Sequence, residues 1–113
     1  MLPEARVYLN DIQRASELLE EFTTGKTLVE YTKDALLRSA TERQFEIIGE
    51  AISKLARVDA VTASRITEYQ RIISFRNFLI HQYSAVEDEL VWNFLKTKLP
   101  ILVLEVDALL QEE

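Results

Sequence analysis

One stretch of eight residues, Arg76-Asn77-Phe78-Leu79-Ile80-His81-Gln82-Tyr83, gathers the side chains most able to do chemistry. It contains the only histidine of the chain, together with a fixed cation, an amide and a phenol. A guanidinium binds phosphate through a rigid fork of N–H donors, and an imidazole exchanges a proton near neutral pH. Together these side chains could bind a phosphate group and transfer a proton.

The spacing of these residues decides whether one helix could bring them together. At 100° per residue, Asn77 and His81 share a helix face, and Arg76 and Tyr83 would share another if the helix continued that far. Arg76 and His81 are five residues apart, about 140° around the axis. Either the helix ends near His81, or a second copy of the chain completes the site across a two-fold axis. The second arrangement favours a homodimer with this helix in its interface.

A structural role for the same residues is the alternative. His81 could be a core or boundary histidine that is hydrogen-bonded to a backbone carbonyl, with Tyr83 packed nearby. Arg76, however, falls on an apolar stripe of its predicted helix, where a guanidinium needs a partner. This position favours a functional site, although spacing alone leaves both interpretations open.

The composition predicts a single domain, residues 1–113, built from helices. The chain is 48% hydrophobic and 28% charged, and its two glycines and two prolines are too few for a many-stranded fold. It has no cysteine, which excludes a disulfide or thiolate metal site. It also has no apolar run near the roughly 20 residues of a membrane span and no basic-then-apolar leader pattern. These features predict a cytoplasmic protein.

The charge distribution restricts the expected contact with nucleic acid to a small site. The net charge of −6 opposes broad electrostatic binding to a polyanion. Residues 33–76 nevertheless hold eight Lys and Arg against six Asp and Glu, whereas the segments on either side are acidic. A local basic site that ends at Arg76 is therefore compatible with an acidic protein.

Hydrophobic periodicity predicts four helices with short connections, which favours an all-α, up-and-down four-helix bundle. The first helix covers about residues 3–22 and ends at a break with Gly25 as terminator. A short extra helical turn is expected near residues 28–32. The second long helix covers about residues 34–55. Gly49 in its middle costs about 1 kcal/mol relative to Ala, which would be offset if another helix passes close there.

The third and fourth helices flank the candidate site. The third is expected to follow a connection at residues 57–63, to begin near residue 62 or 64 and to run to about residue 80. A capping box of Ser84 and Glu87 would open the fourth, and Pro100 should kink or interrupt it. The expected inner faces are, in helix order, Tyr8, Ile12, Ala15, Leu19 and Phe22; Leu37, Ala40, Gln44, Ile47, Ile48, Ala51, Ile52 and Leu55; Ile66, Tyr69, Ile73, Arg76 and Ile80; and Val91, Phe94, Leu95, Leu102, Val106 and Leu109.

Three ordered blocks of the sequence resemble those of the HEPN superfamily, specifically its HepT branch. The first is Arg76-x4-His81-x-Tyr83, with Asn77 directly after the arginine. The segments Arg43–Ala51, which ends in Ile-Gly-Glu-Ala, and Val91-Trp92 through Leu99-Pro100 resemble the second-helix and fourth-helix blocks. The resemblance covers nearly the whole chain. The chain departs from the family at Ser84-Ala85-Val86-Glu87, where Gly and Asp often follow the tyrosine.

The resemblance implies a HEPN-like fold and a metal-independent endoribonuclease that acts on RNA as a homodimer, without a cofactor. Such proteins are toxins of two-gene toxin–antitoxin pairs. Their antitoxin is a minimal nucleotidyltransferase of the MntA type. It silences the toxin by attaching adenylyl groups to the motif tyrosine, which is Tyr83 in this chain.

The chemistry of the residues agrees with this implication. RNA can be cut by its own 2′-hydroxyl, which loses a proton and attacks the adjacent phosphorus while the leaving oxygen gains a proton. His81 is the natural acid or base, and Arg76 would stabilise charge on the phosphoryl oxygens. Asn77 could orient His81 or contact phosphate. Tyr83 could hold the RNA backbone. An adenylyl group on Tyr83 would block RNA binding through its bulk and its negative charge.

Other residues of the matching blocks have weaker functional interpretations. Arg43 and Glu50 lie seven residues apart on one helix face and could steady the site, but an ordinary structural polar pair is the simpler interpretation. Trp92 and the phenylalanines are expected in the core. Two other functions stay open: a non-catalytic partner and adenylylation substrate of a minimal nucleotidyltransferase, and a structural helical dimer without chemistry.

Overall fold

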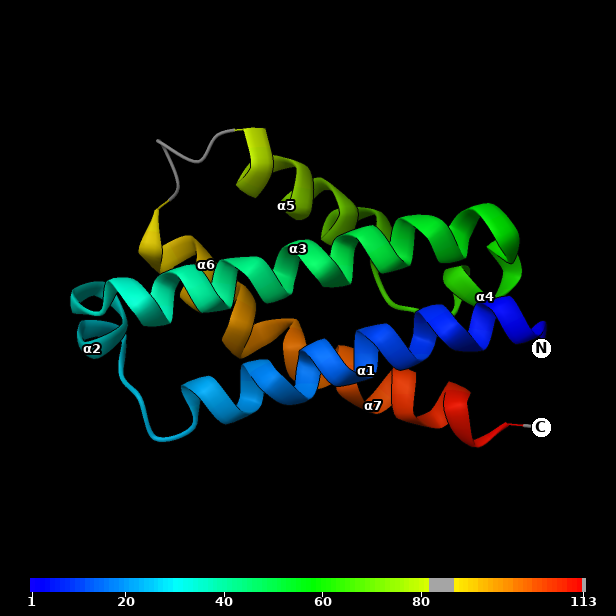
Figure 1. The fold of residues 1–113 in the computed structure, drawn as a ribbon, viewed down its shortest axis with the longest axis horizontal. Coiled ribbons are helices and arrows are strands. Elements are labelled where there is room, and N and C mark those ends of the chain that lie inside the picture. Colours follow the sequence, from blue (N-terminus) through cyan, green and yellow to red (C-terminus); the bar gives the residue numbers. More distant parts are fainter. Residues whose placement is uncertain (82–86, 113) are drawn as a thin grey trace.

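The computed structural model describes residues 1–81 and 87–112, and within these ranges every regular element is a helix. Figure 1 shows the long helices running alternately in opposite directions along the molecule, with the last arm divided into α6 and α7. The predicted all-α, up-and-down bundle is confirmed. In chain order the helices are α1 (Pro3–Thr23), α2 (Leu28–Lys33), α3 (Ala35–Val58), α4 (Ala60–Ser64), α5 (Tyr69–His81), α6 (Asp88–Thr97) and α7 (Leu99–Gln111).

Local sequence signals place the first two helices. Pro3 occupies the first turn of α1, and Gly25 follows the helix with a φ of 76°, so its predicted role as terminator is confirmed. The short helix α2 is also confirmed. Its start is fixed by a capping box in which the Thr27 hydroxyl accepts from the Glu30 N–H and the Glu30 carboxylate accepts from the Thr27 N–H.

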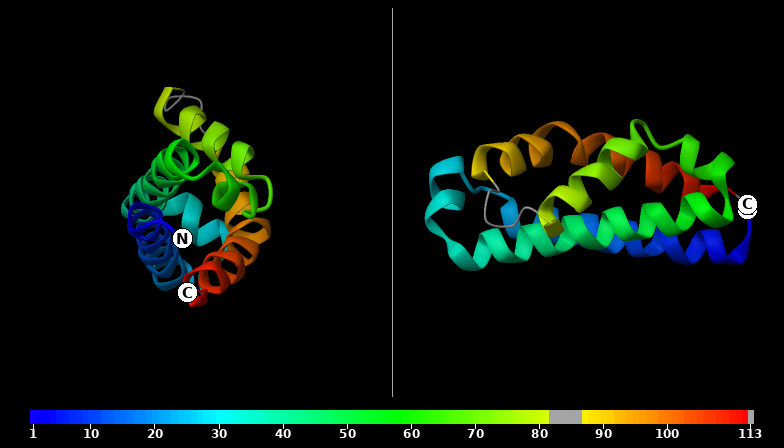
Figure 2. Two further views of the ribbon diagram at one scale, coloured as in Figure 1. Left: turned by 90° about the vertical axis from the view of Figure 1, so that its right-hand side faces the viewer. Right: turned by 90° about the horizontal axis from the view of Figure 1, so that it is seen from above.

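The core lies between α1, α3 and the α6–α7 arm, and α5 packs against α3 at one side (Figure 2). The predicted inner face of the α6–α7 arm is buried throughout, and that of α1 is buried at its three central positions. In α3 the prediction is partly wrong, because Ala40, Gln44 and Ile47 are half-buried while Thr41 and Phe45 take the inner positions. Within the described residues, no helix is both long and apolar enough to cross a lipid bilayer.

Gly49 marks the point where α5 crosses α3. A Cβ atom at Gly49 would overlap the Cβ of Arg76, lie 2.7 Å from its Cγ, and lie 3.3 Å from the carbonyl oxygen of Ile72. The predicted close approach of another helix is therefore confirmed. The absence of a side chain at Gly49 lets the backbones of α3 and α5 come this near.

The predicted start of the third helix near residue 62 or 64 is wrong. α3 extends to Val58, and the short helix α4 then fills most of the predicted connection at residues 57–63. Asp59 starts α4 because its carboxylate accepts from the Thr62 N–H at 3.1 Å. Glu68 then adopts a φ of 54°, a left-handed conformation that ends helical continuity, and α5 begins only at Tyr69.

The turn before α5 is attached to α7 by side chains. The carboxylate of Glu105 accepts from the backbone N–H of Thr67 at 2.9 Å and from its hydroxyl at 2.7 Å. Glu68 also accepts from Lys98, at the start of α7. These contacts hold the beginning of α5 against the last arm of the bundle.

The buried face of α5 also differs from the predicted stripe. Ile72, Phe75 and Leu79 face the core, whereas Tyr69, Ile73, Arg76 and Ile80 are half-buried at its edge. Both stripes are apolar at helical spacing, so periodicity alone could not choose between them. Arg76 therefore lies at the boundary of the core and not on its inner face.

The last arm begins and breaks at identifiable residues. α6 starts at Asp88 with Glu87 as its N-cap, without a capping side-chain hydrogen bond. Ser84, the predicted partner in a capping box, lies outside the described residues. Pro100 sits in the first turn of α7, one residue after the break between the helices, so the predicted interruption is confirmed.

Trp92 connects α6 to α2. Its ring is half-buried, and its centroid lies 5.3 Å from that of the fully buried Tyr31, with 40° between the ring planes. The ammonium of Lys96 lies 4.8 Å from the Trp92 ring centroid, within the range of a cation–π contact. Trp92 thus has the packing role that the sequence suggested.

Candidate functional site

α5 carries three of the four motif residues in its last two turns. Arg76 is half-buried, and Asn77 and His81 are exposed. Tyr83 lies outside the described residues. In Figures 1 and 2 this end of α5 lies on the outer side of the bundle, away from α1 and α7. The site residues are therefore presented by one helix whose opposite face is anchored by apolar contacts.

The side chain of Arg76 is held in place over much of its length. Its Cβ and Cγ atoms lie against Gly49 of α3, and its Nε is buried with no hydrogen-bond partner among the described residues. Its Nη1 donates to the Oδ1 of Asn77 at 2.9 Å. Arg76 thus presents a guanidinium whose stem is fixed and whose donors are only partly used.

Asn77 is joined to Arg76 in this structure. Because its carbonyl oxygen accepts the hydrogen bond from Arg76, its amide NH2 group remains available as a donor. No hydrogen bond links Asn77 to His81 within residues 1–81 and 87–112, so the suggested orienting of His81 is not seen. A pair of donors from adjacent residues suits an anionic ligand such as a phosphate.

His81 is the last residue of α5, and its imidazole is exposed. The sequence left two arrangements open for Arg76 and His81, a helix that ends near His81 or a site completed by a second copy; the described part of α5 reaches His81, and both arrangements stay predictions. Within the described residues, no hydrogen bond joins the side chains of Arg76 and His81.

Arg43 and Glu50 form ion pairs with neighbours on α3 and not with each other. Arg43 Nη1 lies 3.3 Å from the Glu46 carboxylate, and Glu50 lies 3.5 Å from the Lys54 ammonium. The Glu50–Lys54 pair is exposed and is of the i,i+4 kind that contributes roughly 0.3–0.5 kcal/mol on a helix, whereas Glu46 is half-buried. Their supporting role at the site stays a prediction.

A cluster of charged residues between α3 and the start of α6 was not anticipated. Burial, Asp88 and Glu46 together raise the pKa of Glu42, and the nearby Arg38 opposes the rise. Burial likewise raises the pKa of Tyr31, with further contributions from Glu42 and Asp88. Arg38, Glu42 and Glu46 follow one another on α3, but Asp88 lies far along the chain from them, so no local pattern could have revealed its place in the cluster.

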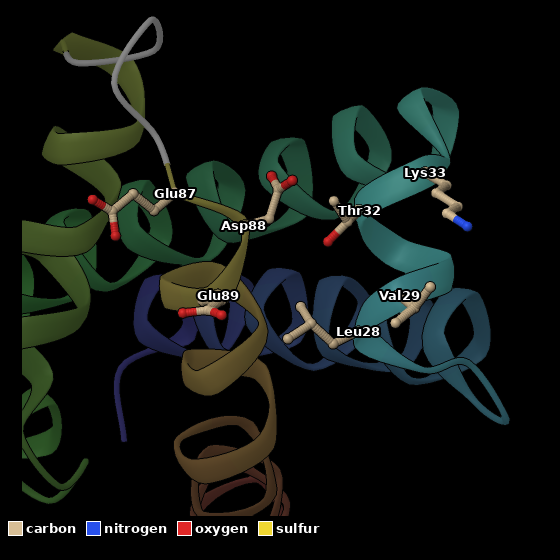
Figure 3. Close-up of a pocket in the computed structure, with 7 residues that line it drawn as sticks. All are labelled: Leu28, Val29, Thr32, Lys33, Glu87, Asp88 and Glu89. Carbon is tan, nitrogen blue, oxygen red and sulfur yellow. The ribbon is translucent and has the colours of Figure 1, made fainter.

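A hollow of the described surface lies beside this cluster, between α2 and the start of α6 (Figure 3). It measures about 520 Å³ and is mostly apolar. Its lining residues are Leu28, Val29, Thr32, Lys33, Glu87, Asp88 and Glu89. It contains none of the predicted site residues, and its three carboxylates would repel a phosphate, so we do not assign it to the site.

Metal-binding groups do not cluster at the site. Within the described ranges, no three His, Asp or Glu side chains are placed to hold one metal ion together.

The family model described as "Ribonuclease HepT-like" matches residues 12–109. The chain belongs to this HepT-like family.

Named relatives of the chain carry related descriptions. A "Putative RNase" from Caldanaerobacter subterraneus subsp. tengcongensis is 32% identical, covering 96% of this chain and 96% of its own. A "Probable ribonuclease HepT" from Thermococcus cleftensis is 35% identical over 84% of this chain and 86% of its own. A "Gamma-glutamylcyclotransferase and putative RNase" from Methanocaldococcus jannaschii is 32% identical over 99% of this chain, which spans only 50% of that protein. No solved structure shows a significant match to the chain. The family and these relatives support a ribonuclease function.

Proposed function

We propose that this chain is an endoribonuclease that cleaves RNA without a metal ion or cofactor and acts as the toxin of a toxin–antitoxin pair. The observation that carries the proposal is Arg76, whose shielded Nε lacks a partner within the described residues and whose Nη1 is bonded to Asn77. A buried donor without an acceptor is unfavourable. A phosphate would supply acceptor oxygens in the geometry that a guanidinium fork requires.

Cleavage would proceed by attack of the 2′-oxygen on the adjacent phosphorus. A base removes the 2′-hydroxyl proton, the O2′–P bond forms, the P–O5′ bond breaks, and an acid protonates the departing 5′-oxygen. The products are a 2′,3′-cyclic phosphate and a free 5′-hydroxyl. His81 performs one of the two proton transfers, and Arg76 stabilises the charge on the non-bridging oxygens.

Two proton transfers and a single histidine per chain favour a homodimer with a composite site. A second copy would contribute another His81, so that one imidazole acts as base and the other as acid. Ile73 and Ile80 are half-buried on the same side of α5 as Arg76 and offer an apolar surface for that copy. The dimer would thus bury these side chains and bring the two sites together.

Control by a partner belongs to the same proposal. Tyr83 follows His81 by two residues, and its role rests on the family motif. A minimal nucleotidyltransferase of the MntA type would attach adenylyl groups to Tyr83 in the cytoplasm. The added bulk and negative charge would then exclude the RNA backbone from the site.

The first experiment is an RNA cleavage assay in EDTA. Wild type and His81→Ala are made without a nucleotidyltransferase, and intact mass confirms an unmodified Tyr83. We expect cleavage by wild type and a loss of roughly 100- to 10,000-fold in His81→Ala, while Gln70→Ala, an exposed change on the same helix, stays active. Loss of wild-type cleavage in EDTA would contradict the metal-independent mechanism. No cleavage by folded wild type on several RNA classes would favour the partner-module function.

A mixing experiment tests the composite site. Wild type and His81→Ala are refolded together in varied proportions, so that heterodimers form. If each site needs one His81 from each copy, a heterodimer is inactive, and cleavage falls with the square of the wild-type fraction. A fall in direct proportion to that fraction would show that each site uses the histidine of one chain only.

A further inference from the structure

The stem of Arg76 passes over Gly49 of α3. A Cβ at this position would overlap the Arg76 Cβ and lie 2.7 Å from its Cγ. Glycine is unfavourable in the middle of a long helix, so its presence at this crossing calls for a reason at this contact. We propose that Gly49 is a positioning residue that fixes where the Arg76 guanidinium emerges from the bundle. This inference rests on the proposed role of Arg76 in RNA cleavage.

The surroundings leave little freedom for α5 to move away from a larger residue at position 49. The carbonyl oxygen of Ile72 would lie 3.3 Å from the added Cβ, so the α5 backbone is also close. One residue before Arg76, Phe75 packs against Phe45 of α3 and Phe94 of α6. A shift of α5 would disturb these ring contacts. The Cβ of Arg76 is fixed by the α5 backbone, so a Cβ at Gly49 could be accommodated only by such a shift, which would carry the Arg76 guanidinium with it.

The path of the Arg76 aliphatic stem determines where its N–H donors lie and which of them a phosphate could contact. Nε is shielded, and Nη1 is bonded to Asn77, so the guanidinium plane is defined by contacts on two sides. A displacement of about 1 Å at a group that stabilises a transition state can reduce a rate by roughly 100-fold. A methyl group at Gly49 should therefore impair cleavage through Arg76 while the bundle remains folded.

The test compares Gly49→Ala with Ser39→Ala. Ser39 is a small, exposed residue of α3 that lies away from the crossing, and its replacement likewise introduces alanine, the best helix former. We expect Gly49→Ala to lower kcat for RNA cleavage about 10- to 100-fold with little change in KM, and Ser39→Ala to match wild type. Unchanged cleavage by folded Gly49→Ala would overturn the proposal.

A double variant tests whether the contact with Arg76 is what requires a glycine at position 49. Arg76→Gly removes the Cβ that the added methyl group would overlap. Gly49→Ala should therefore lower the unfolding midpoint less in an Arg76→Gly background than in wild type. An equal loss in both backgrounds would show that the contact with Arg76 does not explain Gly49.

A measurement that needs no activity keeps the inference testable if Gly49→Ala does not fold or wild type does not cut RNA. The Nε–H of Arg76, identified by NMR through its loss in Arg76→Lys, should exchange with water at least 10-fold more slowly than that of Arg57, an exposed arginine of α3. Equal exchange rates would show that the stem is not held against Gly49. Slow exchange in a protein that cuts no RNA would retain the positioning and reject the catalytic role.

Discussion

The rings of Phe75 and Phe94 stack almost parallel, with centroids 4.1 Å apart and 11° between their planes. Phe45 of α3 meets both rings edge-on, at centroid distances of 5.3 Å and 5.6 Å. Three helices are joined through this cluster, and one of them carries Arg76 and His81. The position of the candidate site thus depends on aromatic packing on the opposite face of α5.

Phe75→Ala should destabilise the protein by about 3–5 kcal/mol, because it removes a buried ring and leaves a cavity among the other two. The measurement is urea unfolding. Phe78→Ala, which changes a half-buried ring on the same helix, should cost clearly less. Equal losses from the two variants would contradict the anchoring role of the Phe75 ring.

Arg76→Lys should impair RNA cleavage nearly as much as Arg76→Ala while leaving stability close to wild type. Lysine retains the Cβ and Cγ that pack on Gly49 and also the charge, but it lacks Nε and the planar fork. Cleavage rates and unfolding midpoints test this expectation. The matched control is Arg71→Lys, at an exposed arginine that pairs with Glu68, which should remain active. Full activity in Arg76→Lys would mean that charge alone is needed.

Glu42→Gln should stabilise the protein at pH 7 but not at pH 3. Burial, Asp88 and Glu46 raise the pKa of Glu42 in the folded state, so the folded protein holds this proton more tightly than the unfolded chain. Stability therefore falls as pH rises from about 4 through the folded pKa, and the loss persists above it. Since the group is partly solvent-screened, we expect a gain of only a few tenths of a kcal/mol, roughly. Chemical unfolding at both pH values is the measurement, with Glu21→Gln on α1 as the exposed control. A gain that is equal at pH 3 and pH 7 would exclude the carboxylate charge as its cause.

Tyr31→Phe should preserve or raise stability at neutral pH, by up to about 1 kcal/mol, because the buried Tyr31 hydroxyl has no hydrogen-bond partner among the described residues. Burial also raises the pKa of Tyr31. The unfolded phenol ionises near pH 10, so the folded state binds more protons above that value and wild type loses stability there. Thermal unfolding at pH 7 and 10.5 should show a smaller alkaline loss in Tyr31→Phe. Tyr69→Phe, which removes a hydroxyl that accepts from Gln70, should give no gain at neutral pH. A large destabilisation of Tyr31→Phe at pH 7 would reveal a partner for the hydroxyl.

The features that the sequence predicted correctly depend on near neighbours along the chain. Gly25, Pro100 and the start of α2 act through backbone conformation within a few residues, and Gly49 stands out because its residue type is unusual in a long helix. The buried face of α5 could not be predicted in this way. Ile72 and Ile73 are adjacent and equally apolar, and only the aromatic cluster with α3 and α6 decides which of them turns inward.

The candidate site, like the fold, could be predicted from the sequence only in part. The residue types and spacing of Arg76, Asn77 and His81 identified them, since few structural needs explain that set. The hydrogen bond from Arg76 to Asn77 and the shielding of Nε depend on where α3 passes. The spacing of residues along the chain carries no information about that position. The break at Glu68 was likewise hidden, because residues 60–68 have no glycine or proline to signal it.

The contact between Trp92 and Tyr31 gives the protein an optical reporter of its own. Trp92 is the single tryptophan of the chain, and it lies against α2 at the end of the bundle where α6 begins. Its fluorescence therefore comes from one known place. Energy absorbed by Tyr31 passes readily to an indole in contact with it, so tryptophan emission under tyrosine excitation follows whether α2 stays docked on α6. Binding of RNA or of a partner near this end can thus be followed in the unlabelled protein.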